Sequence, residues 1–106
     1  MTRLYSLGEW TVKSGEEDDF VAAWNDFADW TTSNTSGNTW AKLLRDRDAP
    51  RRFISFGPWE DEEAVARWRQ HSGFEEHVAR IQEHVEAFVP HTMTVAVEVG
   101  PATPDP

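Results

Sequence analysis

The chain has 106 residues, enough for one domain with one hydrophobic core and too few for two. It carries 19 acidic and 10 basic residues, a net charge of −9, so we expect neither a nucleic-acid nor a membrane partner. It has no cysteine, which excludes disulfides, iron–sulfur clusters and cysteine-based zinc sites. Because a reducing compartment fits this composition and the N-terminal residues lack a continuous apolar stretch, we expect a cytoplasmic protein.

The first expected element is a strand over residues 4–13, where apolar and polar residues alternate. Ser14 and Glu17 then have the spacing of a capping box, which predicts that a helix begins there. An apolar stripe at helical spacing follows: Phe20, Trp24, Phe27, Ala28 and Thr31. The polar run over residues 31–38 is expected to end this helix.

Residues 39–47 and 52–59 predict two strands, joined by a turn at residues 48–50. The four acidic residues 60–63 come next and favour the start of a second helix. One face of that helix would present Ala64, Trp68 and His71. Ser72 and Gly73 are expected to stop it.

A second capping-box spacing, from Ser72 to Glu75, predicts that a new helix begins at once, so that the second helical segment is split in two. Its apolar stripe would consist of Phe74, Val78, Ile81, Val85 and Phe88. Pro90 is expected to end this helix, and residues 92–99 alternate as a last strand would.

The elements therefore follow the order β-α-β-β-α-β over residues 1–99, and a tail without core-forming residues occupies 100–106. This order predicts an α+β, ferredoxin-like fold in which the helices cover one face of an antiparallel sheet. Both faces of the predicted strands carry apolar side chains. Leaving about six of them in water would forgo on the order of 10 kcal/mol, so we expect a homodimer packed sheet to sheet.

The aromatic content is the unusual feature of the composition. The six tryptophans fall in three predicted strands and two predicted helices: Trp10, Trp24, Trp30, Trp40, Trp59 and Trp68. Two interpretations fit this distribution. The indoles either fill the core, each with a partner for its N–H group, or wall a cavity for a flat polycyclic ligand.

The histidines are the candidate proton-transfer groups: His71, His77, His84 and His91. On one helix, His77 and His84 would be separated by about 10 Å of rise, too far for one metal ion, and we expect no metal site. His71 lies where the helix is interrupted, beside Trp68 and Phe74, and is the first candidate for a catalytic base, with His77 the second. The sequence holds none of the usual nucleotide-cofactor motifs.

One long segment carries a resemblance to a known family: Leu43-Leu44-Arg45-Asp46, Asp48-Ala49-Pro50-Arg51-Arg52-Phe53, Ser55-Phe56-Gly57-Pro58-Trp59-Glu60-Asp61, Ala64 and Trp68. Over roughly residues 4–99 the chain resembles the antibiotic biosynthesis monooxygenase family, and Trp59-Glu60-x-x-x-Ala64 is the most characteristic piece. The resemblance implies a dimeric α/β barrel, in agreement with the two apolar sheet faces.

Two branches of that family suggest different functions. Quinone-forming members oxidise polycyclic phenols or anthrones with O2 and no cofactor. Trp59 matches a pocket Trp of that branch, whereas Ser55 stands where an Asn is expected and Val65 where a Tyr is expected.

Haem-degrading members use an Asn on the first strand, a Trp on the second helix and an axial His later on. Trp68 matches the Trp, but Gly8 falls at the Asn position and Val78 at the His position, with His77 one residue away. One residue turns a helical side chain by about 100°, which disfavours the haem interpretation.

The leading hypothesis is a cofactor-independent monooxygenase that oxidises a flat aromatic metabolite, with His71 or His77 as base. The expected pocket residues are Trp24, Trp40, Phe56, Trp59, Trp68 and Phe74. A non-catalytic dimeric protein that binds a small apolar ligand and a haem-degrading monooxygenase are the alternatives.

Overall fold

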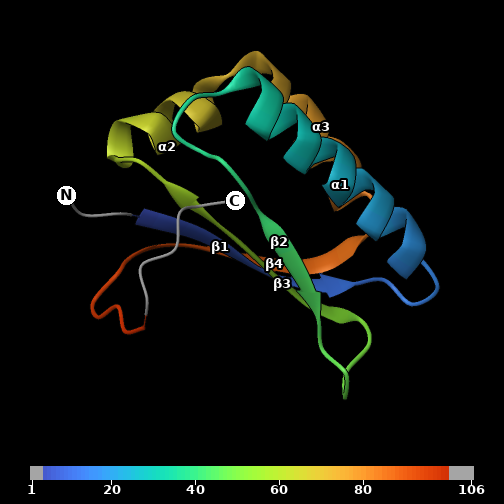
Figure 1. Ribbon diagram of the computed structural model, residues 1–106. Coiled ribbons are helices and arrows are strands. Elements are labelled where there is room, and N and C mark those ends of the chain that lie inside the picture. Colours follow the sequence, from blue (N-terminus) through green and yellow to red (C-terminus); the bar gives the residue numbers. More distant parts are fainter. Residues whose placement is uncertain (1–3, 101–106) are drawn as a thin grey trace.

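Three helices lie on one face of a four-stranded antiparallel sheet in the computed structural model, which describes residues 4–100 (Figure 1). The elements follow in the order β1 (Leu4–Val12), α1 (Glu17–Asn34), β2 (Lys42–Arg45), β3 (Arg52–Trp59), α2 (Glu62–Gln70), α3 (Ser72–Gln82) and β4 (Val85–Thr94). This confirms the ferredoxin-like α+β fold and the split of the second helical segment. Of the predicted tail, residues 101–106 lie outside the described residues.

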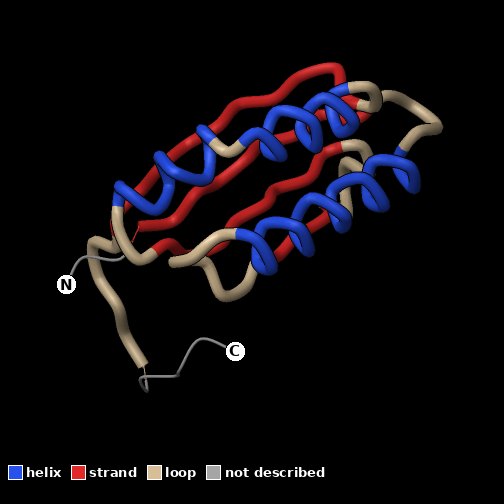
Figure 2. The backbone as a smooth tube through the Cα atoms, turned by 90° about the horizontal axis from the view of Figure 1, so that it is seen from above, coloured by secondary structure: helices blue, strands red, loops and turns tan. Residues whose placement is uncertain are grey.

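The sheet has the strand order β2-β3-β1-β4, so β1 is flanked by β3 and β4. Leu4 lies opposite Trp59, and Trp10 lies between Phe53 and Phe88. Seen from above, α2 and α3 form one row and α1 runs beside them (Figure 2). Within residues 4–100, no helix is long and apolar enough to cross a membrane.

The core between sheet and helices has two parts. One cluster of buried side chains comprises Trp10, Val12, Phe20, Phe27, Phe53 and Ile81. The other comprises Leu4, Trp59, Ala64 and Val65. Trp68 of α2 packs against both clusters and therefore lies at the junction between them.

The opposite face of the sheet carries the second set of alternating side chains, which no described helix covers (Figure 1). Its apolar members are Tyr5, Leu7, Leu44, Ile54, Phe56, Val89 and Met93. Leu44 remains 51% exposed, and Val89 and Met93 are each 48% exposed. We call this set the outer face.

The end of the chain departs from the sequence prediction. β4 spans Val85–Thr94, so Val85 and Phe88 belong to a strand and not to a helix, and residues 95–99 are not part of it. The helical spacing of these two residues predicted the wrong element, because contacts across the sheet determine where they lie. Phe88 stacks on Trp10 with ring centroids 4.0 Å apart. Pro90 is accommodated because β4 is an edge strand.

Helix ends also differ from the predicted capping boxes. α1 has Glu16, not Ser14, at its N-cap, and no side chain caps it. α3 begins after His71, whose ring nitrogen accepts a hydrogen bond from the Gly73 N–H in place of the expected Ser72 hydroxyl. His84 lies in the turn after α3, so the helical spacing from His77 does not apply. β2 is also shorter than the predicted strand over 39–47.

Candidate functional site

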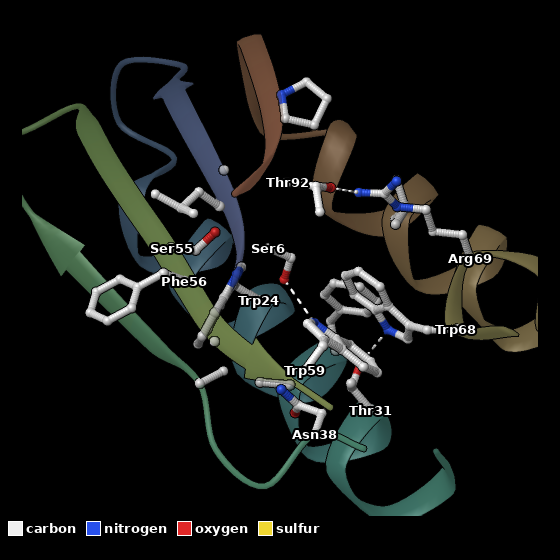
Figure 3. Close-up of a pocket in the computed structure, with 18 of the residues that line it drawn as sticks. Ser6, Trp24, Thr31, Asn38, Ser55, Phe56, Trp59, Trp68, Arg69 and Thr92 are labelled. Carbon is white, nitrogen blue, oxygen red and sulfur yellow. Dashed lines mark hydrogen bonds between the residues drawn. The ribbon is translucent and has the colours of Figure 1, made fainter. Parts of the chain in front are cut away.

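A cavity of about 430 Å³ lies between the sheet and the helices, at the junction of the two core clusters (Figure 3). Its size falls within the range of about 300–1,000 Å³ that is typical of small-molecule sites. The aromatic residues that line it are Trp10, Trp24, Phe27, Phe56, Trp59, Trp68, Phe74 and Phe88. The space between sheet and helices is therefore not filled by the indoles.

Hydrogen bonds fix three of the indole rings to hydroxyl groups of the cavity lining. Trp10 Nε1 donates to Ser55 Oγ at 2.9 Å, Trp59 Nε1 to Ser6 Oγ at 3.0 Å and Trp68 Nε1 to Thr31 Oγ1 at 3.0 Å. An indole N–H can only donate, so each hydroxyl oxygen is the acceptor and keeps its own hydrogen for another partner. The cavity thus presents apolar ring faces and hydroxyl donors.

Neighbouring aromatic side chains hold Trp68 from several sides. Its ring centroid lies 4.7 Å from that of Trp59, and it meets Phe74 edge-on at 4.9 Å. Phe27 of α1 stacks against it at 5.6 Å with an interplanar angle of 23°. Residues from β3, α1, α2 and α3 therefore combine to place this one ring.

Asn38, in the loop between α1 and β2, borders the cavity and is buried. Its side-chain Nδ2 donates to the Pro58 carbonyl at 2.7 Å and to the Trp40 carbonyl at 3.2 Å. Both partners are acceptors, which identifies the donating end of the amide. Asn38 therefore ties the loop to β3 beside the cavity, a role that the sequence analysis did not identify.

Five of the six predicted pocket residues line the cavity: Trp24, Phe56, Trp59, Trp68 and Phe74. The ring of Phe56, however, points away from Trp59 and Trp68 (Figure 3) and meets Trp40 edge-on at 5.8 Å. Trp40 is not among the lining residues; it lies beside Phe56 and also contacts Tyr5. The structure therefore associates Trp40 with the outer face.

The two predicted bases, His71 and His77, do not line the cavity. His71 Nδ1 accepts a hydrogen bond from the Gly73 N–H at 3.0 Å, so its basic lone pair is already engaged. His77 Nδ1 lies 2.8 Å from the Gly73 carbonyl oxygen, which can only accept, so Nδ1 carries a hydrogen and the Nε2 lone pair of the neutral ring is free. Both rings pack on Trp30, with centroids 4.9 Å from its own.

A separate group of polar and charged side chains lies at the outer face. His91 Nε2 is 2.7 Å from Glu9 Oε2, and Arg52 donates to the other Glu9 oxygen at 3.3 Å. The hydrogen bond with His91, assisted by Arg52, holds the pKa of Glu9 below its ordinary value of 4.5. His91 borders the cavity, but its ring is engaged with Glu9 on the opposite side of the sheet.

The described cavity lining contains no Asp or Glu side chain. Over residues 4–100 there is also no group of three His, Asp or Glu side chains placed to hold a metal ion. The site is best described as an aromatic chamber with hydroxyl donors and, at one end, the guanidinium of Arg69.

A family model described as antibiotic biosynthesis monooxygenase matches residues 4–92. The chain belongs to this family. This membership agrees with the resemblance found in the sequence and with the fold.

Solved structures share the fold at low sequence identity. SnoaB, a cofactor-independent oxygenase from Streptomyces nogalater, superposes with a TM-score of 0.84 at 20% identity over 96% of this chain and 100% of its own. A putative antibiotic biosynthesis monooxygenase from Bordetella bronchiseptica gives 0.79 at 20% identity, covering 93% of this chain and 100% of its own. A putative antibiotic biosynthesis monooxygenase from Nitrosomonas europaea superposes with a TM-score of 0.78 at 14% identity, over 92% of this chain and 94% of its own. No curated protein matches the chain.

Proposed function

We propose that this protein is a cofactor-independent monooxygenase that oxidises a flat aromatic metabolite with O2. The observation that carries the proposal is the cavity itself, whose walls are indole and phenyl rings. Family membership and the fold shared with SnoaB, which is a cofactor-independent oxygenase, support the same reaction class.

In this reaction the substrate loses a proton, and its electron-rich anion passes electrons to O2. One oxygen atom enters the substrate and the other leaves as water. The hydroxyls of Ser6, Thr31 and Ser55 support such a step, because each accepts from an indole and keeps a hydrogen for an anionic oxygen of the substrate. Donors placed where charge develops are a common source of rate enhancement.

The proton acceptor is a separate part of the proposal. Of the two predicted bases, His77 is the stronger candidate, because its Nε2 is free whereas His71 Nδ1 caps α3. Its ring would have to leave Trp30 to reach the cavity. A substrate that ionises in water before it binds needs no base in the cavity. The variant His77→Ala distinguishes this route from deprotonation by His77. If His77 is the base, the variant should lower the rate by about 100-fold or more, and if the substrate ionises in water, the rate should be unchanged.

Haem does not fit the cavity as well as an aromatic substrate does. Val78, at the position expected for the axial ligand, lines the cavity, whereas His77 does not. Among the described lining residues, the only imidazole is that of His91, which is engaged with Glu9. We therefore derive no chemistry through haem.

The test is O2 uptake with anthrones and polycyclic phenols, corrected for their spontaneous oxidation. Ala28 of α1 lines the cavity, so Ala28→Phe should fill it and abolish uptake, whereas Ala22→Phe, at an exposed position of the same helix, should not. No uptake by the unaltered protein with any of these compounds would refute the proposal. Saturable binding without product would instead support a ligand-binding protein without catalysis.

We also propose that the protein works as a homodimer with the outer faces in contact. This face places apolar side chains such as Leu7, Leu44 and Met93 on an uncovered sheet. Because burial on a second copy would contribute much of the stability, Leu7→Asp should give insoluble or unfolded chains. A soluble, folded Leu7→Asp monomer, measured by light scattering, would contradict this arrangement.

A further inference from the structure

Among the described residues, Arg69 is the only Arg or Lys side chain that borders the cavity. Arg69 of α2 and Thr92 of β4 both line it, and Arg69 Nη2 donates to Thr92 Oγ1 at 3.1 Å. Figure 3 shows this pair on one side of Trp59 and Trp68, with Asn38 on the other. Among the described lining residues, polar groups are therefore present on both sides, but the guanidinium lies at one end only.

The charge of Arg69 is not neutralised by the described chain. Arg45, Arg51, Arg52 and Arg80 each form an ion pair with a carboxylate. Arg47, Arg67 and Arg69 form none with a described residue, and of these three only Arg69 borders the cavity. A guanidinium has five N–H donors, and one of them is used here, on Thr92.

Thr92 completes a two-donor site. Its hydroxyl oxygen accepts from Arg69, so its own hydrogen is free to donate in another direction. A carboxylate offers two oxygens with lone pairs and is matched by a guanidinium fork with a hydroxyl beside it. A neutral polycyclic molecule would leave both donors without a ligand partner.

We propose that the ligand of this cavity is an aromatic acid, whose rings lie between the tryptophans and whose carboxylate binds Arg69 and Thr92. This rests on the proposed function in so far as both concern the same cavity, and it adds the anionic group that determines specificity and orientation. In this arrangement Arg69 is a substrate-binding residue at the end of the cavity that lies away from Asn38.

The experiment compares two probes that differ in charge, anthraquinone-2-carboxylate and anthraquinone-2-carboxamide, by isothermal titration calorimetry under nitrogen. Because Arg69 is exposed and partly screened by water, we expect the acid to bind about tenfold more tightly than the amide. Arg69→Gln should remove this preference by weakening the acid alone. Arg67→Gln removes the same charge from an exposed position of α2 that does not border the cavity, and should leave both affinities unchanged.

Three results would overturn the inference: equal affinities for the two probes, no binding of either, or an equal loss of both in Arg69→Gln. The last would mean that Arg69 only holds α2 against β4, which thermal unfolding of the variant would show independently. Arg69→Lys keeps the charge without the fork and should retain part of the preference. The calorimetry is done without O2, so its result does not depend on catalysis. If the protein prefers the acid but takes up no O2 in air, the proposed reaction alone is refuted. If it takes up O2 with neutral anthrones but shows no preference for the acid, this inference alone is refuted.

Discussion

The bond between Trp68 and Thr31 gives a direct test of how the cavity is held. Thr31 is 5% exposed, and its hydroxyl accepts from Trp68 Nε1 at 3.0 Å. Thr31→Val replaces the hydroxyl by a methyl group of similar size, so the indole N–H loses its partner and no space opens for water. A buried donor without a partner costs about 1–3 kcal/mol, which would lower Tm by about 5–15 °C.

Urea and thermal unfolding at one fixed protein concentration measure this loss. Thr32→Val is the matched control, because Thr32 is exposed on the same helix and its hydroxyl bonds only to carbonyls of that helix. This variant should change stability little. Thr31→Ser keeps the hydroxyl and should lower the free energy of unfolding by only about 0.8 kcal/mol, because one buried methyl group is lost.

A double-mutant cycle isolates the bond. With Trp68→Phe there is no indole N–H to leave unpaired, so Thr31→Val should cost less in that background. If Thr31→Val were as stable as the unaltered protein, or cost the same in both backgrounds, the hydroxyl would not hold the ring and the account of the cavity given above would fail.

Substitutions at three further positions test individual contacts. Gly73→Ala would place a Cβ atom 2.5 Å from Trp30 Cζ2. Calorimetry should therefore show that the free energy of unfolding falls by about 1–3 kcal/mol. An unchanged Tm would contradict this packing. Asp61→Ala removes the side-chain cap of α2 and should lower the free energy of unfolding in urea by about 1 kcal/mol. Asp61→Asn keeps a capping oxygen and should retain most of this stability. The pKa of Glu9 is lowered chiefly by its hydrogen bond with His91, so its contribution to stability is present above pH 4.5 and is lost as pH falls through the lower, folded-state pKa. Glu9→Gln should therefore flatten the fall of Tm below pH 4.5, and an identical pH profile would count against the contact.

The parts of the fold that the sequence predicted well are those with a local signal. Alternation over residues 4–13 predicted β1, and the structure shows that Trp10 and Val12 belong to its buried face. β4 was misplaced because Val85 and Phe88 also fit a helical period, and only their contact with β1 across the sheet decides between the two. Such pairing is long-range and leaves no mark in a short window of sequence.

The same distinction applies to the site. The aromatic walls were predicted because large rings are conspicuous, but the hydroxyl acceptors and the Arg69–Thr92 pair were not. A signal for two of the acceptors did exist: Ser6 and Ser55 fall in the same alternation sets as Leu4 and Trp59, and buried indoles need acceptors. Arg69 offered no such signal, because its place at the cavity depends on how α2 packs over β4.

The indole–hydroxyl bonds have a thermodynamic consequence for recognition. A wall whose rings are already fixed loses little side-chain entropy when a ligand arrives, so more of the contact energy remains as affinity. Ligand binding to such a preorganised chamber should show a negative heat-capacity change from apolar burial. Removing one of these hydroxyl acceptors should then lower the affinity for a ligand through an entropic cost, even where the hydroxyl does not contact the ligand.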